Sequence, residues 1–134
     1  MASRDPVTPR LLLLGLLVLA TGCGILEGRD CTTEPVPGIV VTIVDAGTGL
    51  PLAQGAEGVV REGEFQDSLR AYSFNGASEM VSRASAWERR GTYAVVVGHP
   101  GYDLWVRDRV RVDDGECHVR KVELTAELVR APER

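Results

Sequence analysis

Residues Ile39–Asp45 have the sequence IVVTIVD, and this stretch is the strongest indication of the fold class. Six of its seven residues are β-branched, and β-branched side chains pack well on a pleated strand. The run is short and almost wholly apolar, and the turn residues Ala46–Pro51 follow it. It therefore predicts a buried strand that ends at a tight turn.

Further segments of this kind follow at short intervals along the chain. The predicted strands are Ile39–Asp45, Gly58–Glu62, Phe65–Tyr72, Met80–Trp87, Gly91–Gly98, Tyr102–Val112 and Cys117–Val129. Turn residues separate several of them, at Asn75–Gly76, His99–Gly101 and Asp113–Gly115. Phe65–Tyr72 alternates only in part, and it could also form one helical turn. About seven short strands at this spacing predict an all-β, Greek-key sandwich.

The last predicted strand has one irregularity. Its apolar residues at period two are Val122, Leu124, Ala126 and Leu128. Val119 is out of phase with this set, which predicts a β-bulge near Arg120–Lys121.

The clearest alternation lies in Tyr102–Val112. One predicted face carries Val106, Val110 and Val112, and the other carries Arg107, Arg109 and Arg111. Three arginines on one face could bind carboxylate or phosphate groups, with Trp105 as a stacking platform for sugars. The alternative is a solvated face whose arginines pair with acids across the sheet, such as Glu123 or Glu127.

The first 22 residues have the composition of a cleaved export signal. Arg4 and Arg10 supply a basic start, Leu11–Ala20 is an apolar run of ten residues, and small residues follow. The run is too short to cross a hydrocarbon core of ~30 Å, which needs about 20 residues. We therefore expect a signal peptide over 1–22, a tether over 23–37, the sandwich over 38–130 and a short tail over 131–134.

Size and charge restrict the function classes. Removal of 1–22 leaves 112 residues, which is one domain's worth. The leader holds two of the 15 basic and one of the 19 acidic residues, so the remaining chain has a net charge of −5. Phosphate binding needs a basic surface, and this balance argues against a nucleic-acid partner.

The three cysteines fall into two groups. Cys23 follows the predicted leader, whereas Cys31 and Cys117 form an even pair in a chain predicted to be exported. An oxidising compartment favours a disulfide between them. Two free thiols are the alternative, and a zinc site with His99 or His118 is disfavoured because no Cys-x-x-Cys spacing exists.

The sequence contains no recognisable catalytic motif. It has no Gly-x-Ser-x-Gly, phosphate loop, His-Glu-x-x-His or dinucleotide fingerprint. His99 precedes a proline in a turn and is expected to be a solvated loop histidine. His118 begins a predicted strand and is expected to have a structural role. We expect no enzyme activity, no metal and no cofactor. An enzyme would require His99 and His118 to converge in one cleft.

Two resemblances extend this interpretation. Leu19-Ala20-Thr21-Gly22-Cys23 resembles the lipobox of bacterial lipoproteins, which implies that Cys23 becomes an acylated (palmitate-type) mature N-terminus. Gly24 follows, which resembles the pattern that permits transfer to the outer membrane. The resemblance implies an outer-membrane anchor in a cell with two membranes, and otherwise an anchor on the outer face of the plasma membrane.

The second resemblance covers about Pro37–Val129. Val44–Leu52 with Gly55-Ala56, and Gly91–Val97 with Gly101-Tyr102, are similar to carboxypeptidase-regulatory-like domains. This family implies a seven-stranded, transthyretin-like sandwich that serves as an accessory domain. In such folds the first and last strands are adjacent and parallel, which implies that Cys31 and Cys117 meet at one end.

These features predict a lipid-anchored, non-enzymatic envelope protein whose sandwich is a structural or protein-interaction module. Its expected partners are the membrane, through Cys23, and another envelope protein. The alternative is a small glycan- or ligand-binding module that uses the face formed by Trp105, Arg107, Arg109 and Arg111.

Overall fold

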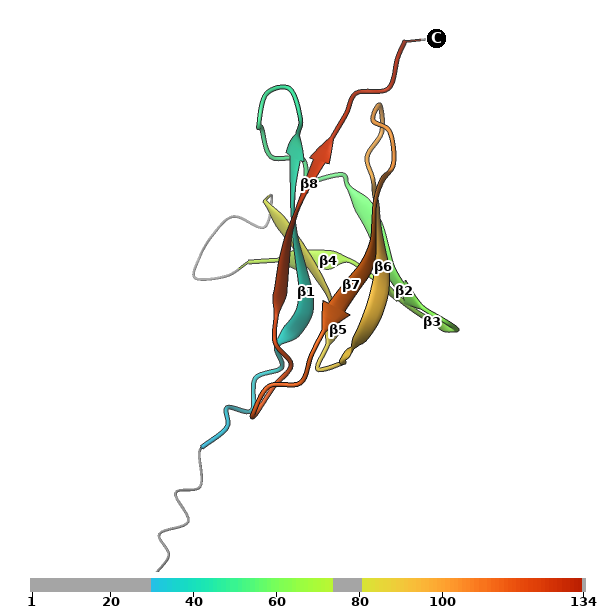
Figure 1. The fold of residues 1–134 in the computed structure, drawn as a ribbon. Coiled ribbons are helices and arrows are strands. Elements are labelled where there is room, and N and C mark those ends of the chain that lie inside the picture. Colours follow the sequence, from blue (N-terminus) through green and yellow to red (C-terminus); the bar gives the residue numbers. More distant parts are fainter. Residues whose placement is uncertain (1–29, 74–80, 134) are drawn as a thin grey trace, which may run out of the picture. The chain divides into compact units, whose positions relative to one another are not determined.

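The computed structural model describes residues 30–73 and 81–133, which contain eight strands and no helix. The strands are β1 (Pro37–Asp45), β2 (Glu57–Glu62), β3 (Phe65–Ser68), β4 (Arg70–Tyr72), β5 (Ser82–Trp87), β6 (Gly91–Gly98), β7 (Trp105–Val112) and β8 (Val122–Leu128). They form two four-stranded sheets with the orders β4-β5-β1-β8 and β3-β2-β6-β7 (Figure 1). The predicted all-β sandwich is confirmed.

The IVVTIVD segment forms most of β1, which is paired along both edges. It is antiparallel to β5 and parallel to β8, in register from Ile39 opposite Val122 to Asp45 opposite Leu128. The first and last strands are therefore adjacent and parallel, as the resemblance implied. The almost continuous apolar run agrees with the burial of β1, where Ile39, Val41 and Ile43 are fully buried and Val40 is 7% exposed.

The core lies between the two sheets. Its fully or nearly buried side chains include Ile39, Val41, Ile43, Val60, Val95, Val97, Val110, Val112, Ala126 and Leu128. Tyr93 is the largest of the fully buried side chains. Its hydroxyl donates toward the backbone oxygens of Arg89 at 2.9 Å and Arg90 at 3.2 Å, so burial of the ring leaves no polar atom unsatisfied.

The predicted strand Phe65–Tyr72 is two strands in different sheets. β3 pairs with β2, whereas β4 pairs with β5 across the sandwich. Leu69 lies between them and is 4% exposed, and its N–H donates to the Gly58 oxygen at 2.8 Å. Leu69 therefore inserts into the core at the corner where the chain crosses between sheets. This break explains the partial alternation, and no helical turn forms.

A β-bulge lies in β7 and not near Arg120–Lys121. Tyr93 of β6 is opposite Val110, but Val95 is opposite Arg107, so β7 holds one extra residue. Arg109, within the bulge, has φ +56°, in the left-handed region. The extra residue reverses the phase of the alternation along β7.

The predicted start of the last strand at Cys117 is also wrong. Regular pairing of β8 begins at Val122. Before it, Asp114 and Val119 form an isolated bridge, and the N–H of Gly115 donates to the His118 oxygen at 2.8 Å. Val119 is out of phase with β8 because it belongs to this separate turn, so no bulge is needed to explain it.

The other predicted boundaries agree to within three residues. Gly91–Gly98 is reproduced as β6, and β1, β2 and β7 each begin or end close to the predicted positions. The predicted leader 1–22, Cys23 and the Asn75–Gly76 turn lie outside the described residues.

Candidate functional site

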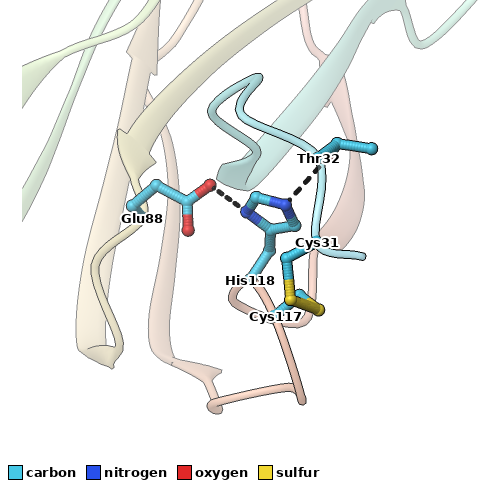
Figure 2. The surroundings of a disulfide bond; sticks show 5 residues. All are labelled: Cys31, Thr32, Glu88, Cys117 and His118. Atoms are coloured by element: carbon cyan, nitrogen blue, oxygen red, sulfur yellow. Dashed lines mark hydrogen bonds and ion pairs between the residues drawn. A yellow bond between two sulfur atoms is a disulfide. The ribbon is translucent and has the colours of Figure 1, made fainter. Parts of the chain in front are cut away.

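The two cysteines predicted to pair form a disulfide. Cys31 precedes β1 and Cys117 lies in the β7–β8 connection, with 5.4 Å between their Cα atoms (Figure 2). The prediction is confirmed, and the bond joins residues 86 positions apart. It attaches the segment before β1 covalently to the sandwich.

Two polar contacts reinforce this attachment. His118 contacts Glu88 Oε1 through Nδ1 at 2.7 Å and Thr32 Oγ1 through Nε2 at 3.0 Å (Figure 2). Glu88 Oε1 also accepts the Val36 N–H at 2.6 Å, and the Glu88 N–H donates to the Val36 oxygen at 3.0 Å. We call Cys31, Thr32, Val36, Glu88, Cys117 and His118 the disulfide clamp.

The electrostatics of the clamp follow from these bonds. The Val36 N–H is the main cause that lowers the pKa of the Glu88 carboxyl, and the hydrogen bond from His118 lowers it further. Both His118 ring nitrogens have protein partners, so the structural role expected for His118 agrees with its contacts. Glu88 was not anticipated, because it lies in a polar turn far from Cys31 and Cys117 along the chain.

A second polar cluster lies at the opposite end of the sandwich, around Asp45. This carboxylate is 3% exposed and accepts the Tyr102 hydroxyl at 2.7 Å. It also accepts the N–H groups of Gly47 at 2.8 Å and Thr48 at 2.9 Å, and Arg130 Nε at 3.2 Å. The Tyr102 hydrogen bond is the main cause that holds the pKa of Asp45 far below its usual range.

The Asp45 cluster joins three chain segments at this end. The β1–β2 loop starts at Asp45, Tyr102 lies in the β6–β7 loop, and Arg130 follows β8. Tyr102 and Arg130 also form an isolated backbone bridge. The only signal for this cluster in the sequence is an Asp before a glycine-containing turn, which is a common place for a side chain to cap backbone N–H groups.

The two histidines do not converge. The His99 ring packs edge-on against Tyr102 with 5.2 Å between centroids, at the Asp45 end, while His118 belongs to the disulfide clamp. Residues 30–73 and 81–133 contain no group of three or more His, Cys, Asp or Glu side chains that could hold a metal ion.

The predicted arginine face is divided by the bulge in β7. Arg107 is opposite the core residue Val95, whereas Arg111 is opposite the exposed Thr92, so the two arginines lie on different faces of the sheet. Arg111 pairs with Asp113 at 2.7 Å. The prediction of three arginines on one face is therefore wrong, because it assumed strict alternation.

Trp105 lies on the inward side of β7. It is opposite the buried Val97 and packs against the core as a partly buried side chain. A ring in this position contributes mainly to packing.

The bulge has a second consequence, on the outer face of the β3-β2-β6-β7 sheet. Val106 was predicted to lie with Val110, but it is opposite Val96 on the outer face and is 53% exposed. Val96 is in turn opposite Val59 of β2. Leu104, 71% exposed, lies beside this row, above Gly98. We call Val59, Val96, Leu104 and Val106 the valine face.

A groove of about 450 Å³ adjoins the valine face near the Asp45 end. Val59, Val96 and Leu104 contribute to its lining, together with Gly58 and Gly98. Exposed apolar side chains gathered around a groove are typical of a contact surface. Sequence reasoning missed this surface because the bulge determines which face Val106 occupies.

No family model matches the chain, and no curated protein matches it. Within the ranges that the structure describes, no helix has the length and apolar character needed to cross a membrane.

Proposed function

We propose that this chain is a lipid-anchored, non-enzymatic envelope protein whose sandwich, of the carboxypeptidase-regulatory-like class, is a protein-interaction module. The observation that carries the proposal is the Cys31–Cys117 disulfide. Disulfides persist in oxidising, extracytoplasmic compartments. The disulfide therefore supports export on grounds independent of the leader sequence.

The disulfide clamp suits a domain that is attached at its N-terminal side. Eight residues, Cys23–Asp30, separate the expected lipid from Cys31. Fully extended, eight residues reach about 28 Å, so a lipid on Cys23 would keep the domain close to the membrane. Force on the tether would act on a covalent bond at Cys31, which protects the β1 pairing from being pulled apart.

The polar contacts favour a binding role over a catalytic one. Asp45 is engaged by Tyr102 and by backbone N–H groups, and Glu88 is engaged by Val36 and His118. Arg89 contacts Glu62 Oε2 at 2.6 Å and the Tyr93 hydroxyl at 2.7 Å. These groups connect loops to the sandwich, whereas the valine face presents apolar surface to a partner.

The expected partner is another envelope protein. The expected location is the outer membrane in a cell with two membranes, and the outer face of the plasma membrane in a cell with one. In-cell photo-crosslinking tests this proposal. A photoreactive residue at Leu104 would probe the valine face, and one at Leu50, which is 63% exposed in the β1–β2 loop, serves as the matched position. Mass spectrometry identifies the attached proteins and the acyl chains on Cys23.

We expect an acylated Cys23 and a reproducible adduct between Leu104 and a protein other than this chain itself, and this adduct should be lost in the Cys23→Ala variant. An acylated chain without any protein adduct from either position would contradict the interaction role. A chain without acylation would contradict the anchor. The alternative, a glycan- or ligand-binding module on Trp105 and the arginines, stays a prediction that a glycan array on the same preparation tests.

A further inference from the structure

The valine face is bordered by charges of opposite sign. The outer face of β2 carries Glu57, Val59 and Arg61 in succession, because these residues pair with the outward positions Gly98, Val96 and Ala94 of β6. Both charged side chains are exposed. In the part of the chain that the structure describes, neither side chain has an ion pair or hydrogen bond. Both are therefore available to a partner.

An apolar row crosses three strands of this sheet, and its member on β2, Val59, lies between the two charged residues. Val59, Val96 and Val106 are successive register partners on β2, β6 and β7. Such a row is a natural line for a twofold axis, since each valine can pack on its own symmetry mate. A twofold interface uses the same patch on both subunits, so the patch must be complementary to itself.

From this arrangement we propose that two copies of the chain pack face to face through the valine face, as a twofold dimer. An axis along the valine row reverses the strand direction. It places Glu57 of one copy opposite Arg61 of the second copy, and Arg61 opposite Glu57. An axis parallel to the strands and along β2 would instead place Glu57 on Glu57 and Arg61 on Arg61, which like-charge repulsion disfavours. An axis along β6 would lay β2 over β7 of the second copy, so Glu57 and Arg61 would not face each other.

The shape of the face agrees with the same axis. Leu104 projects above Gly98, where its Cδ2 atom lies 3.0 Å from the position a Cβ would occupy. Gly98 and Ala94 are two outward positions of β6 on either side of Val96. Reversal of the strand direction brings Leu104 over Ala94 of the second copy. A large side chain then meets a small one, as close packing of two sheets requires.

In this dimer a second copy of the chain occupies the valine face, and the packing requires neither the lipid nor a different protein. The two disulfide clamps would lie at opposite ends of the dimer. A strand of eight residues such as β6 is about 26 Å long, which is close to the reach of each tether. One membrane can therefore hold both anchors when the dimer lies along its surface.

Sedimentation equilibrium of the full chain, extracted from membranes in mild detergent, tests the dimer. The variants are Glu57→Arg, Arg61→Glu, the double swap Glu57→Arg/Arg61→Glu, and Val106→Glu. Glu64→Arg and Arg120→Glu make the same charge changes at exposed positions away from the valine face. Circular dichroism verifies that every variant is folded, which exposed substitutions should leave unchanged.

We expect the wild-type chain to be a dimer and each single charge change to weaken dimerisation about tenfold, because it creates two repulsive contacts. The double swap should restore the wild-type dissociation constant to within about threefold, and Val106→Glu should give monomers. Glu64→Arg and Arg120→Glu should dimerise like the wild type.

A wild-type chain that is monomeric at all concentrations would overturn the dimer, as would a double swap no better than the single changes. The dimer would also be overturned if Glu64→Arg and Arg120→Glu weaken dimerisation as much as the single changes at Glu57 and Arg61. Detergent alone cannot produce the rescue pattern, since micelles do not distinguish the single changes from the double swap. A dimer in a chain without acyl groups would leave this inference intact while contradicting the proposed anchor.

Discussion

The two ends of the sandwich are held together by different means. At one end, the covalent Cys31–Cys117 bond attaches the segment before β1, and the Glu88–His118 contact supports it at the surface. At the other end, the buried Asp45 carboxylate joins the β1–β2 loop, the β6–β7 loop and the residue after β8. The stability of the first end depends on the redox state of Cys31 and Cys117. The stability of the second end depends on the charge of the Asp45 carboxyl group.

The difference corresponds to the proposed roles of the two ends. A tether loads the end to which it is attached, and a covalent bond resists that load whatever the pH. The Asp45 end carries loops that need only remain packed, and a cluster of charge-assisted hydrogen bonds suffices for this. Three substitutions test this contrast, and their expected effects decrease in the order given.

Loss of the disulfide should have the largest effect. Cys117→Ser removes a bond that closes a loop of 86 positions and should lower the free energy of unfolding by about 4 kcal/mol. Urea unfolding followed by tryptophan fluorescence measures the loss. The double variant Cys31→Ser/Cys117→Ser is the control and should equal the single variant. A loss below about 1 kcal/mol would mean that the clamp is held mainly by its polar contacts.

Asp45→Asn should have an intermediate effect and a defined pH dependence. The substitution removes the negative charge that Tyr102 and Arg130 contact, and at pH 7 it should lower the melting temperature by roughly 5 °C. Because the pKa of Asp45 is lowered by folding, its ionised form stabilises the wild type above the unfolded pKa of about 3.9.

That contribution is lost as the pH falls toward the folded pKa of Asp45. The difference between wild type and Asp45→Asn should therefore be constant near neutrality and should shrink below about pH 4. Thermal unfolding by circular dichroism at several pH values measures this difference. Tyr102→Phe, which removes the main hydrogen-bond donor, should reproduce part of the effect. A difference that grows in acid would rule out this assignment of the charge.

Glu88→Gln should have the smallest effect. The amide oxygen can still accept the Val36 N–H, and the Glu88 side chain is 37% exposed, so water screens the lost charge. The lowered pKa of Glu88 means that any stabilisation is present at neutral pH and is lost below about pH 4. Thermal unfolding should show a change of about 1–2 °C at pH 7. An effect as large as that of Asp45→Asn would remove the contrast between the ends.

Much of the fold could be predicted from local patterns. β1 and β6 are runs of β-branched residues bounded by turns, and their predicted ranges agree closely with the structure. The disulfide could be predicted from Cys31 and Cys117, the even pair that remains once Cys23 is assigned to the lipid. These features depend on the residues themselves and on their immediate neighbours.

The errors occur where a distant contact overrides a local pattern. Leu69 is drawn into the core, so Phe65–Tyr72 becomes two strands. In β7 the apparent alternation of arginines continues through the bulge, but the pairing with β6 does not. An alternating sequence pattern does not show where a strand holds one residue more than the neighbouring strand with which it pairs.

The amino-acid sequence by itself determined that the domain is all-β, which segments form most strands and which cysteines pair. Only the tertiary structure decided that Asp45 contacts Tyr102 and Arg130, 57 and 85 positions away, and that Val106 faces outward beside Val96. The physical reason is that strand formation is largely a local preference of β-branched side chains. Polar clusters and exposed faces instead depend on register, which is established only when the strands pair.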